Sequence, residues 1–254
     1  MRGISLFAAA CCVVLAGCGP GESAGADEKT LPAFTVTAAA PQIDEASMPA
    51  EARALVERTR RTIDAIPVTP DSLSSDFPDE MRNRVERDQI ARRALGSVDD
   101  LPEDQRRRAE EVLGAMMMRI DAENTAWLKS RLPENGWFLI SRDGPTVANG
   151  AFLLVQHSGD QALMQETLTR MTPLFGTPEL RGQDYALLFD RVALVTGRPQ
   201  RYGSQIGCEA GRIGFQNLDR SGDVEARRRE VGFTETLEAY AKNFPNFGEP
   251  CAGL

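Results

Sequence analysis

An apolar stripe with a helical period, from Pro102 to about Arg131, constrains the fold of this chain more than any other feature of its sequence. Proline is favoured in the first turn of a helix, and Pro133 would stop the helix soon after Arg131. The apolar side chains recur every three or four residues, at Ala109, Val112, Leu113, Met116, Met117, Ile120 and Trp127. This pattern is typical of a long helix with one buried face, and we interpret its methionines as core packing rather than a cofactor site.

Shorter helical patterns on both sides of the stripe predict a mainly α fold. The expected helices span residues 47–66, 79–96, 147–157, 160–171, 183–196, 223–231 and 234–243, with Ser47 and Thr234 as N-caps. Residues 183–196 are apolar on nearly all sides, which indicates a buried central helix. Gly136–Ile140 reads as a short extended piece, and glycines around Glu209-Ala210 indicate a small β-hairpin at about 202–218. We therefore expect residues 46–254 to form one compact multi-helix domain.

The first 17 residues have the features of a secretion signal. Arg2 precedes an apolar segment, Ile4–Ala16, that is too short to span a bilayer as a helix. The sequence Leu15-Ala16-Gly17-Cys18 resembles the lipobox of bacterial lipoproteins. This resemblance implies cleavage before Cys18, acylation of that cysteine and attachment to the lipid bilayer. The alternative is an ordinary cleavage site beside a chance cysteine.

The residue after Cys18 and the composition that follows refine this expectation. Position 19 is glycine rather than aspartate, which in lipoproteins implies passage to the outer membrane, facing the periplasm. Residues 18–45 are rich in glycine, alanine, proline and acidic residues and lack an apolar period. We expect this segment to be a flexible tether between the lipid anchor and the folded domain.

Only two cysteines would remain for a disulfide in the mature chain. Of the five cysteines, Cys11 and Cys12 leave with the signal, and Cys18 carries the lipid. Cys208 and Cys251 can then pair in an oxidising compartment, and the loop that they close is worth about 4 kcal/mol in the chain-entropy model. The alternative is two free thiols, because spacing alone gives no geometry.

Charge and ligand counts exclude some partners. The net charge of −8 argues against a nucleic-acid partner held by phosphate contacts, and a single histidine excludes multi-histidine metal sites. Residues 219–230 place Asp219, Ser221, Asp223, Glu225 and Glu230 at calcium-loop positions. The position that needs glycine is Val224, and a helix N-cap at Ser221 or Asp223 explains the same letters. We predict no metal and no cofactor.

Several polar side chains interrupt segments that should be buried. Asp88 and Arg92 share the inner stripe of the 79–96 helix, and Asp190-Arg191 interrupt the central helix. Others end the 147–157 helix or open the hairpin, namely Gln156, His157, Gln200, Tyr202, Ser204 and Gln205. Because buried charges must be paired, we expect these elements to converge.

The same residues carry a resemblance to a family. The segments that match, in order, are Asp88-Gln89, Asp121–Trp137, Val155–His157, Asp190-Arg191, Gln200–Gln205 and Arg228-Arg229 with Gly232-Phe233. This order, over roughly residues 80–240, resembles a bacterial family catalogued only as a domain of unknown function, numbered sixty-six twenty-four. Ser204 stands where the family has threonine. The resemblance implies no activity, but it adds Arg228 to the candidate binding residues.

Two functions fit these observations. The first is a non-catalytic binding or structural lipoprotein of the envelope, which recognises a peptide or glycan through residues such as Gln200, Tyr202 and Gln205. The second is a hydrolase-type enzyme with His157 as general base, oriented by Asp190 or Asp88.

Each candidate residue also has a purely architectural interpretation. His157 can be a core histidine, Asp190-Arg191 a structural ion pair, and the hairpin residues hydrogen-bonding partners of the body. An enzyme needs these side chains around a cleft that solvent reaches, whereas an architectural role allows them to be sealed.

Overall fold

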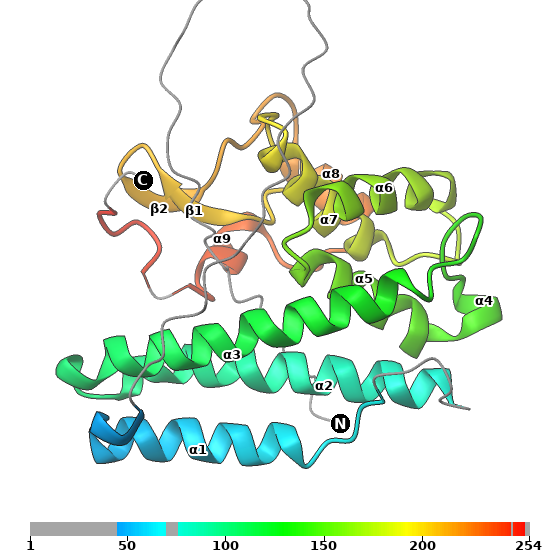
Figure 1. The fold of residues 1–254 in the computed structure, drawn as a ribbon. Helices are drawn as coiled ribbons and strands as arrows, with labels where there is room; N and C mark the ends of the chain where they lie inside the picture. Colours follow the sequence, from blue (N-terminus) through cyan, green and yellow to red (C-terminus); the bar gives the residue numbers. More distant parts are fainter. Residues whose placement is uncertain (1–44, 70–75, 245, 252–254) are drawn as a thin grey trace, which may run out of the picture.

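A layer of three long helices forms one side of the molecule. The computed structural model describes residues 45–69, 76–244 and 246–251. Helices α1 (Ala50–Asp64), α2 (Phe77–Gly96) and α3 (Glu103–Lys129) lie side by side (Figure 1). Their apolar stripes meet in one cluster, with Val56, Ile63 and Leu113 at its centre. The short 3-10 helices η1 (Glu45–Ser47) and η2 (Ser97–Asp100) flank this layer.

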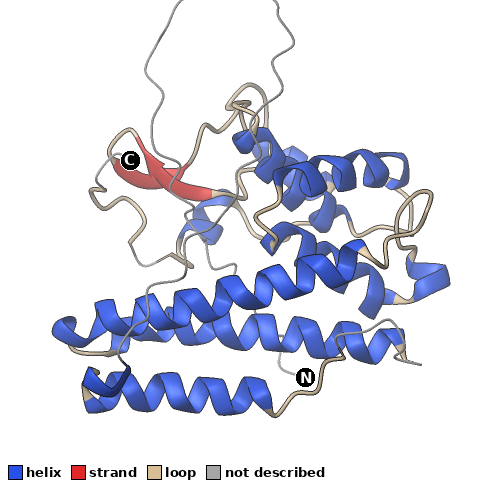
Figure 2. Ribbon diagram, in the orientation of Figure 1, coloured by secondary structure: helices blue, strands red, loops and turns tan. Residues whose placement is uncertain are grey.

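The second half of the chain packs on top of this layer. It contains α4 (Ile140–Asp143), α5 (Pro145–His157), α6 (Gln161–Met171), η3 (Thr172–Leu174) and α7 (Gly182–Val195). Helix α5 contacts both α2 and α3, and α6 packs against α7 (Figure 2). A second apolar cluster, which includes the buried side chains of Trp137, Leu154 and Leu188, fills the space between these helices.

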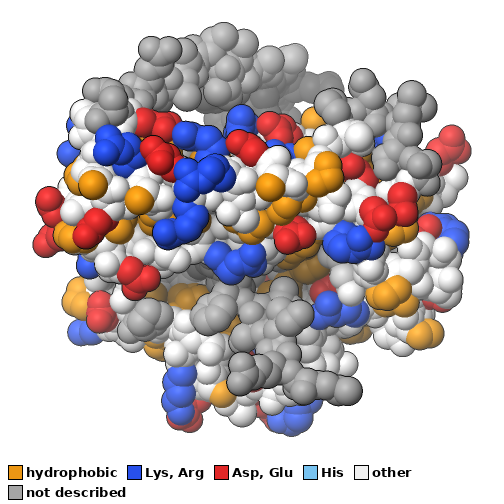
Figure 3. All heavy atoms as spheres, turned by 90° about the horizontal axis from the view of Figure 1, so that it is seen from below, with side chains coloured by type: hydrophobic (Ala, Val, Ile, Leu, Met, Phe, Trp, Pro, Cys, Tyr) orange, Lys and Arg blue, Asp and Glu red, His pale blue; other side chains and the backbone are white. Residues whose placement is uncertain are grey.

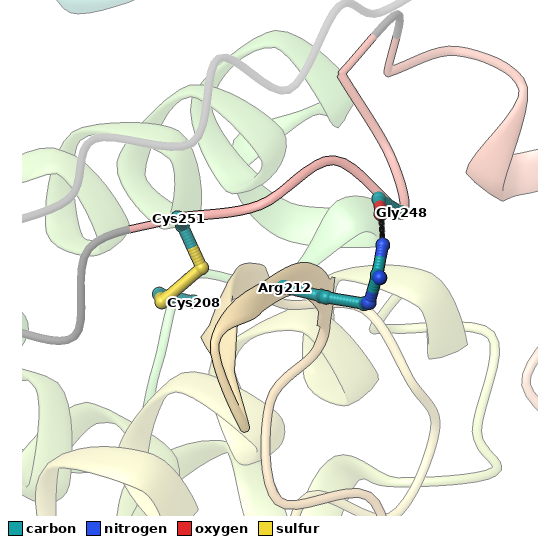
Figure 4. Close-up of a disulfide and its surroundings, with 4 residues drawn as sticks. All are labelled: Cys208, Arg212, Gly248 and Cys251. Carbon is teal, nitrogen blue, oxygen red and sulfur yellow. Dashed lines mark hydrogen bonds between the residues drawn. A yellow bond between two sulfur atoms is a disulfide. The ribbon is translucent and has the colours of Figure 1, made fainter.

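The C-terminal segment contains the only sheet among the described residues. Strands β1 (Ile206–Glu209) and β2 (Arg212–Phe215) are antiparallel, with Ile206 opposite Phe215. Two short helices follow, α8 (Val224–Glu230) and α9 (Leu237–Ala241). A disulfide joins Cys208 of β1 to Cys251, and Arg212 donates a hydrogen bond of 2.7 Å to the carbonyl of Gly248 (Figure 4). The end of the described chain is thus attached to the hairpin.

This architecture confirms the prediction of a mainly α fold with one small hairpin and a Cys208–Cys251 disulfide. Residues 136–139 pair with no strand of the described chain; Leu139 is extended, as the sequence predicts, and Trp137 and Phe138 pack into the core. Two local predictions are wrong. Ser47 does not cap α1, because it lies in η1 and the helix begins after Pro49. Helix α9 is capped by Thr236 rather than by Thr234.

The predicted signal, Cys18 and nearly all of the predicted tether lie outside the described residues. Within the described ranges, no helix is long and apolar enough to cross a membrane. Seen from below, the molecule carries interspersed acidic and basic side chains with apolar atoms between them (Figure 3).

Candidate functional site

A close approach of α2 and α5 brings the site together. A Cβ atom at Gly150 of α5 would lie 2.6 Å from Cγ of Met81 on α2, so only glycine fits without displacement of the buried methionine. Two helical turns beyond Met81 and Gly150, α2 and α5 carry Asp88 and His157. Their side chains meet, with His157 Nδ1 at 3.0 Å and 3.1 Å from the two carboxylate oxygens of Asp88.

Asp88 is the centre of a buried hydrogen-bond network. Its carboxylate also accepts hydrogen bonds from Arg92 Nε at 3.0 Å and from Gln89 Nε2 at 2.8 Å. Burial alone would raise the pKa of Asp88, but His157, Arg92 and Gln89 together lower it to about 2. Arg92 also binds both oxygens of Asp121, at 2.6 Å and 2.8 Å. The Asp88 carboxylate is therefore ionised at neutral pH and its orientation is fixed.

Burial favours the neutral form of His157, which can accept a hydrogen bond. Burial lowers its pKa below the ordinary value of 6.5, and the attraction of Asp88 only partly opposes this effect. A neutral imidazole that donates from Nδ1 to Asp88 carries a lone pair on Nε2. Gln156 Nε2 lies 3.4 Å from that atom. The arrangement can bind a donor or remove a proton at Nε2.

His157 lines a cavity of about 690 Å³. Helices α2, α5 and α7 form one wall, and the hairpin entrance, α8, α9 and the turn between them form the other. Six carboxamide side chains line it: Gln89, Asn149, Gln156, Gln183, Gln205 and Asn243. Apolar lining comes from side chains such as Leu153, Ile206 and Phe233. The cavity is polar enough to bind a ligand by hydrogen bonds from several sides.

The second wall is held in place by buried side chains that bind backbone groups. Asp190 of α7 accepts hydrogen bonds from the backbone N–H groups of Arg201, Tyr202 and Ser204, at 2.6 to 3.2 Å. Gln200 Nε2 donates to the carbonyl oxygens of Gln205 and Gln216, and its Oε1 accepts from the N–H group of Gln205. These bonds close the 200–205 loop.

Arg228 links this loop to the C-terminal turn. It is 1% exposed, and its guanidinium donates to the carbonyl oxygens of Tyr202 and Glu235 at 2.8 Å and 3.2 Å. The same group lies over the rings of Phe233 and Tyr240. The 202–205 and 233–235 segments are therefore held together, side by side, at the cavity.

Comparison with known proteins places this arrangement in a family. A family model described as a family of unknown function (DUF6624) matches residues 75–246. The chain belongs to the DUF6624 family. No curated protein and no solved structure matches the chain. Every residue that lines the cavity lies within the DUF6624 match, whereas α1 precedes it. The cavity is thus part of the DUF6624 domain.

The candidate residues of the DUF6624 domain fall into two groups. Five of them line the cavity: Gln156, His157, Arg191, Gln205 and Arg228. The others lie behind its walls: Asp88, Arg92, Asp190, Gln200 and Tyr202. Of the two carboxylates considered for His157, Asp88 is the partner, since both oxygens of Asp190 are occupied by backbone N–H groups. The pairing of His157 with Asp190 is therefore replaced by His157 with Asp88.

Several lining residues were not singled out by the sequence. Asn149, Gln183 and Asp184 lie in first turns or on helix faces where polar residues are common. Their residue types therefore do not indicate that they line a site. Gln89 follows Asp88 in the family pattern, which could have identified it.

Metal ligation is not favoured by the described residues, which contain no group of three His, Cys, Asp or Glu side chains able to hold an ion. In the 219–230 segment, Asp223 caps α8 by accepting from the N–H group of Ala226. Asp219 accepts from Ser221. The N-cap interpretation therefore holds for Asp223, and Asp219 closes the turn before the helix.

Proposed function

We propose that this DUF6624 protein is a lipid-anchored protein of the cell envelope that binds a small polar ligand, a peptide or glycan fragment, in the cavity. One observation carries the proposal: His157 and six carboxamides line a single cavity of about 690 Å³. That volume lies in the range of small-molecule sites. Carboxamides both donate and accept hydrogen bonds, as do the amides of peptides and the hydroxyl and acetamido groups of glycans.

Five of the six carboxamides are already oriented by the protein. Gln89 donates to Asp88 at 2.8 Å, Gln205 Nε2 donates to Ser204 Oγ at 3.0 Å, and Gln156 lies beside His157. Gln183 Nε2 donates to the carbonyl of Gly232, and Asn243 Nδ2 donates to Glu235 at 3.4 Å. Amides that are fixed in this way lose little entropy on binding, which favours affinity for a ligand of matching pattern.

Binding can be tested through the only histidine of the chain. Diethyl pyrocarbonate acylates neutral imidazole, so all histidine modification in this protein reports on His157. We expect N-acetylglucosamine or N-acetyl-alanine amide to slow the modification and to shift the NMR signals of the imidazole. His157→Gln provides the unmodified control. Equal modification rates and unchanged signals with both probes would contradict ligand binding.

The lipid anchor is supported by Leu15-Ala16-Gly17-Cys18 and by the tether-like composition of residues 18–45. Expression of the full chain in a bacterium should give a membrane-bound protein whose N-terminal peptide carries acyl chains at Cys18. Cys18→Ser should release the protein from the outer membrane, because two or more acyl chains are needed for stable attachment. An unmodified Cys18, or a mature chain that starts elsewhere, would contradict the anchor.

A second candidate function, hydrolysis, is favoured by the Asp88–His157 pair. Nε2 of His157 can take a proton from water while the water oxygen bonds to the carbonyl carbon of an ester or amide. The proton then passes from Nε2 to the leaving oxygen or nitrogen as its bond to carbon breaks. Asp88 would stabilise the transient imidazolium through Nδ1.

Hydrolysis is tested by turnover of p-nitrophenyl acetate and of N-acetyl-alanine amide. Asp88→Asn and His157→Gln should each lower the rate by about a hundredfold or more if the pair acts as a general base. Probe binding without turnover by the wild-type protein would leave binding as the function and exclude hydrolysis of these substrates.

A further inference from the structure

Asp184 differs from the other buried carboxylates of the described chain. Asp88 and Asp190 each accept at least three hydrogen bonds, and Glu80 binds both Thr69 and Arg84. Asp184 is 3% exposed, yet its carboxylate has no hydrogen-bond donor among the described residues. Its nearest cation is Arg181, whose Nε lies 3.7 Å from Oδ1. A buried carboxylate with so little support is expensive in its ionised form.

The side chain also lines the cavity that contains His157. Burial raises the pKa of Asp184 to about 7, and the charge of Arg181 only partly opposes this effect. The charged groups that face the same cavity are Arg82, Arg181, Arg191, Arg228 and Glu235, together with neutral His157. A protonated Asp184 is therefore a donor in a cavity where His157 is an acceptor.

We propose that Asp184 is a ligand-binding residue of this cavity, where its carboxyl group donates a hydrogen bond to a carbonyl oxygen of the ligand. The ligand donates an N–H or O–H group to Nε2 of His157. This complementarity assigns the ligand to the amide-bearing class, such as a peptide or an N-acetylated sugar. The assignment rests on the proposed binding function and adds to it a residue and a substrate class.

The protonation state can be measured without a ligand. The carboxyl carbon signal of Asp184, assigned by its loss in Asp184→Asn, should titrate with a midpoint near 7, far above the ordinary value of 3.8. A midpoint below about 5 would overturn the proposal, because the group would then be an acceptor at neutral pH.

Two variants then separate the donor from a merely structural role. Asp184→Asn keeps an N–H donor and should bind N-acetylglucosamine or N-acetyl-alanine amide as the wild type does. Asp184→Leu removes the donor and should bind about tenfold more weakly, the loss expected for one hydrogen bond. Glu238→Gln, a change of one exposed acid outside the cavity, is the charge control. Melting temperatures establish that all three variants fold.

The outcomes distinguish this inference from the proposed function. No binding of either probe to the wild type overturns the proposed function, and the role of Asp184 falls with it. Binding that Asp184→Leu retains overturns the role of Asp184 alone. Binding that Asp184→Asn loses also overturns it, since the carboxylate would then act through its charge.

Discussion

The two walls of the cavity are stabilised in different ways. One wall is formed by α2, α5 and α7 and is called the α2–α5 wall. Its helices pack through apolar side chains around Gly150, and the polar side chains Asp88, Arg92 and His157 bind one another. The other wall, the C-terminal wall, is formed by the hairpin entrance, α8, α9 and the turn between them. Its segments are short, and Asp190, Gln200 and Arg228 bind backbone groups of its loops. A disulfide adds a covalent link on that side only, among the described residues.

The wall that positions the Asp88–His157 pair is therefore different from the wall that gives the rest of the cavity its shape. Helix packing holds the Asp88–His157 pair, so substitutions on the C-terminal wall should change the cavity without disturbing that pair. Loop backbone has many N–H and C=O groups that cannot remain unpaired when buried. Asp190 and Gln200 meet this requirement from behind the wall, whereas Arg228 does so while also lining the cavity.

The largest expected effect is at Asp190 of α7, whose carboxylate holds the loop of the C-terminal wall. Asp190→Ala leaves the N–H groups of Arg201, Tyr202 and Ser204 without their acceptor. Because each unpaired buried donor is costly, we expect a loss of about 3–5 kcal/mol in urea unfolding. Asp223→Ala is the matched control, since this exposed residue caps one N–H group and should cost about 1 kcal/mol. Equal losses in the two variants would contradict the role of Asp190.

The disulfide should come next in size. Replacement of Cys208 and Cys251 by serine removes a cross-link worth about 4 kcal/mol at most in the chain-entropy model. Hydrogen exchange should accelerate in β1, β2 and the 246–251 segment, while α2 and α5 keep their protection. If α2 and α5 lose protection equally, the two walls are not independent and the comparison fails.

Asp184 should make the stability of the folded protein depend on pH. Between pH 3.8 and about 7, the unfolded chain releases the proton of Asp184 while the folded chain retains it. The unfolded state then binds fewer protons, so stability falls as pH rises through this window and stays low above it. Asp184→Asn should therefore be more stable than the wild type above about pH 7, by roughly 2–4 kcal/mol, and equally stable below pH 3.8.

The difference between the two unfolding curves is the quantity to measure. Asp121, whose burial raises its pKa to about 7, titrates in both proteins and cancels from the difference. A difference that does not vary with pH would mean that Asp184 is ionised in the folded state throughout.

The longer helices could be predicted from the sequence to within a few residues. Apolar periods depend on the chain's own helical geometry, so α2, α3, α5, α6 and α7 appear where their stripes lie. The hairpin was found through its glycines, although its paired strands are shorter than expected. Local signals failed at two helix caps, where Thr236 rather than Thr234 caps α9 and Pro49 rather than Ser47 precedes α1.

The candidate site could be predicted only in part. Polar residues that interrupt apolar stripes identified Asp88, His157 and Asp190. The sequence could not show which carboxylate forms a hydrogen bond with the histidine. That choice depends on the crossing of α2 and α5 at Gly150, which involves residues far apart in the chain. Asp184 gave no signal, because an acidic residue in the first turn of a helix is ordinary.

The smallest expected effect tests the crossing itself. Gly150→Ala places a methyl group 2.6 Å from Cγ of the fully buried Met81, and we expect a net loss of about 1–3 kcal/mol from overpacking. Gly114→Ala in α3 is the matched control, because a Cβ atom there meets nothing within 4 Å. Alanine is the better helix former, so that control should gain up to about 1 kcal/mol.

The same pair of variants shows whether packing positions the chemistry. Displacement of α5 should lengthen the His157–Asp88 hydrogen bond, which NMR of the imidazole detects through the Nδ1 proton. Gly114→Ala should leave that signal unchanged. A Gly150→Ala protein that is destabilised but keeps the wild-type Nδ1 signal would show that the pair is held by its own hydrogen-bond network, with Arg92 and Gln89, rather than by the helix crossing.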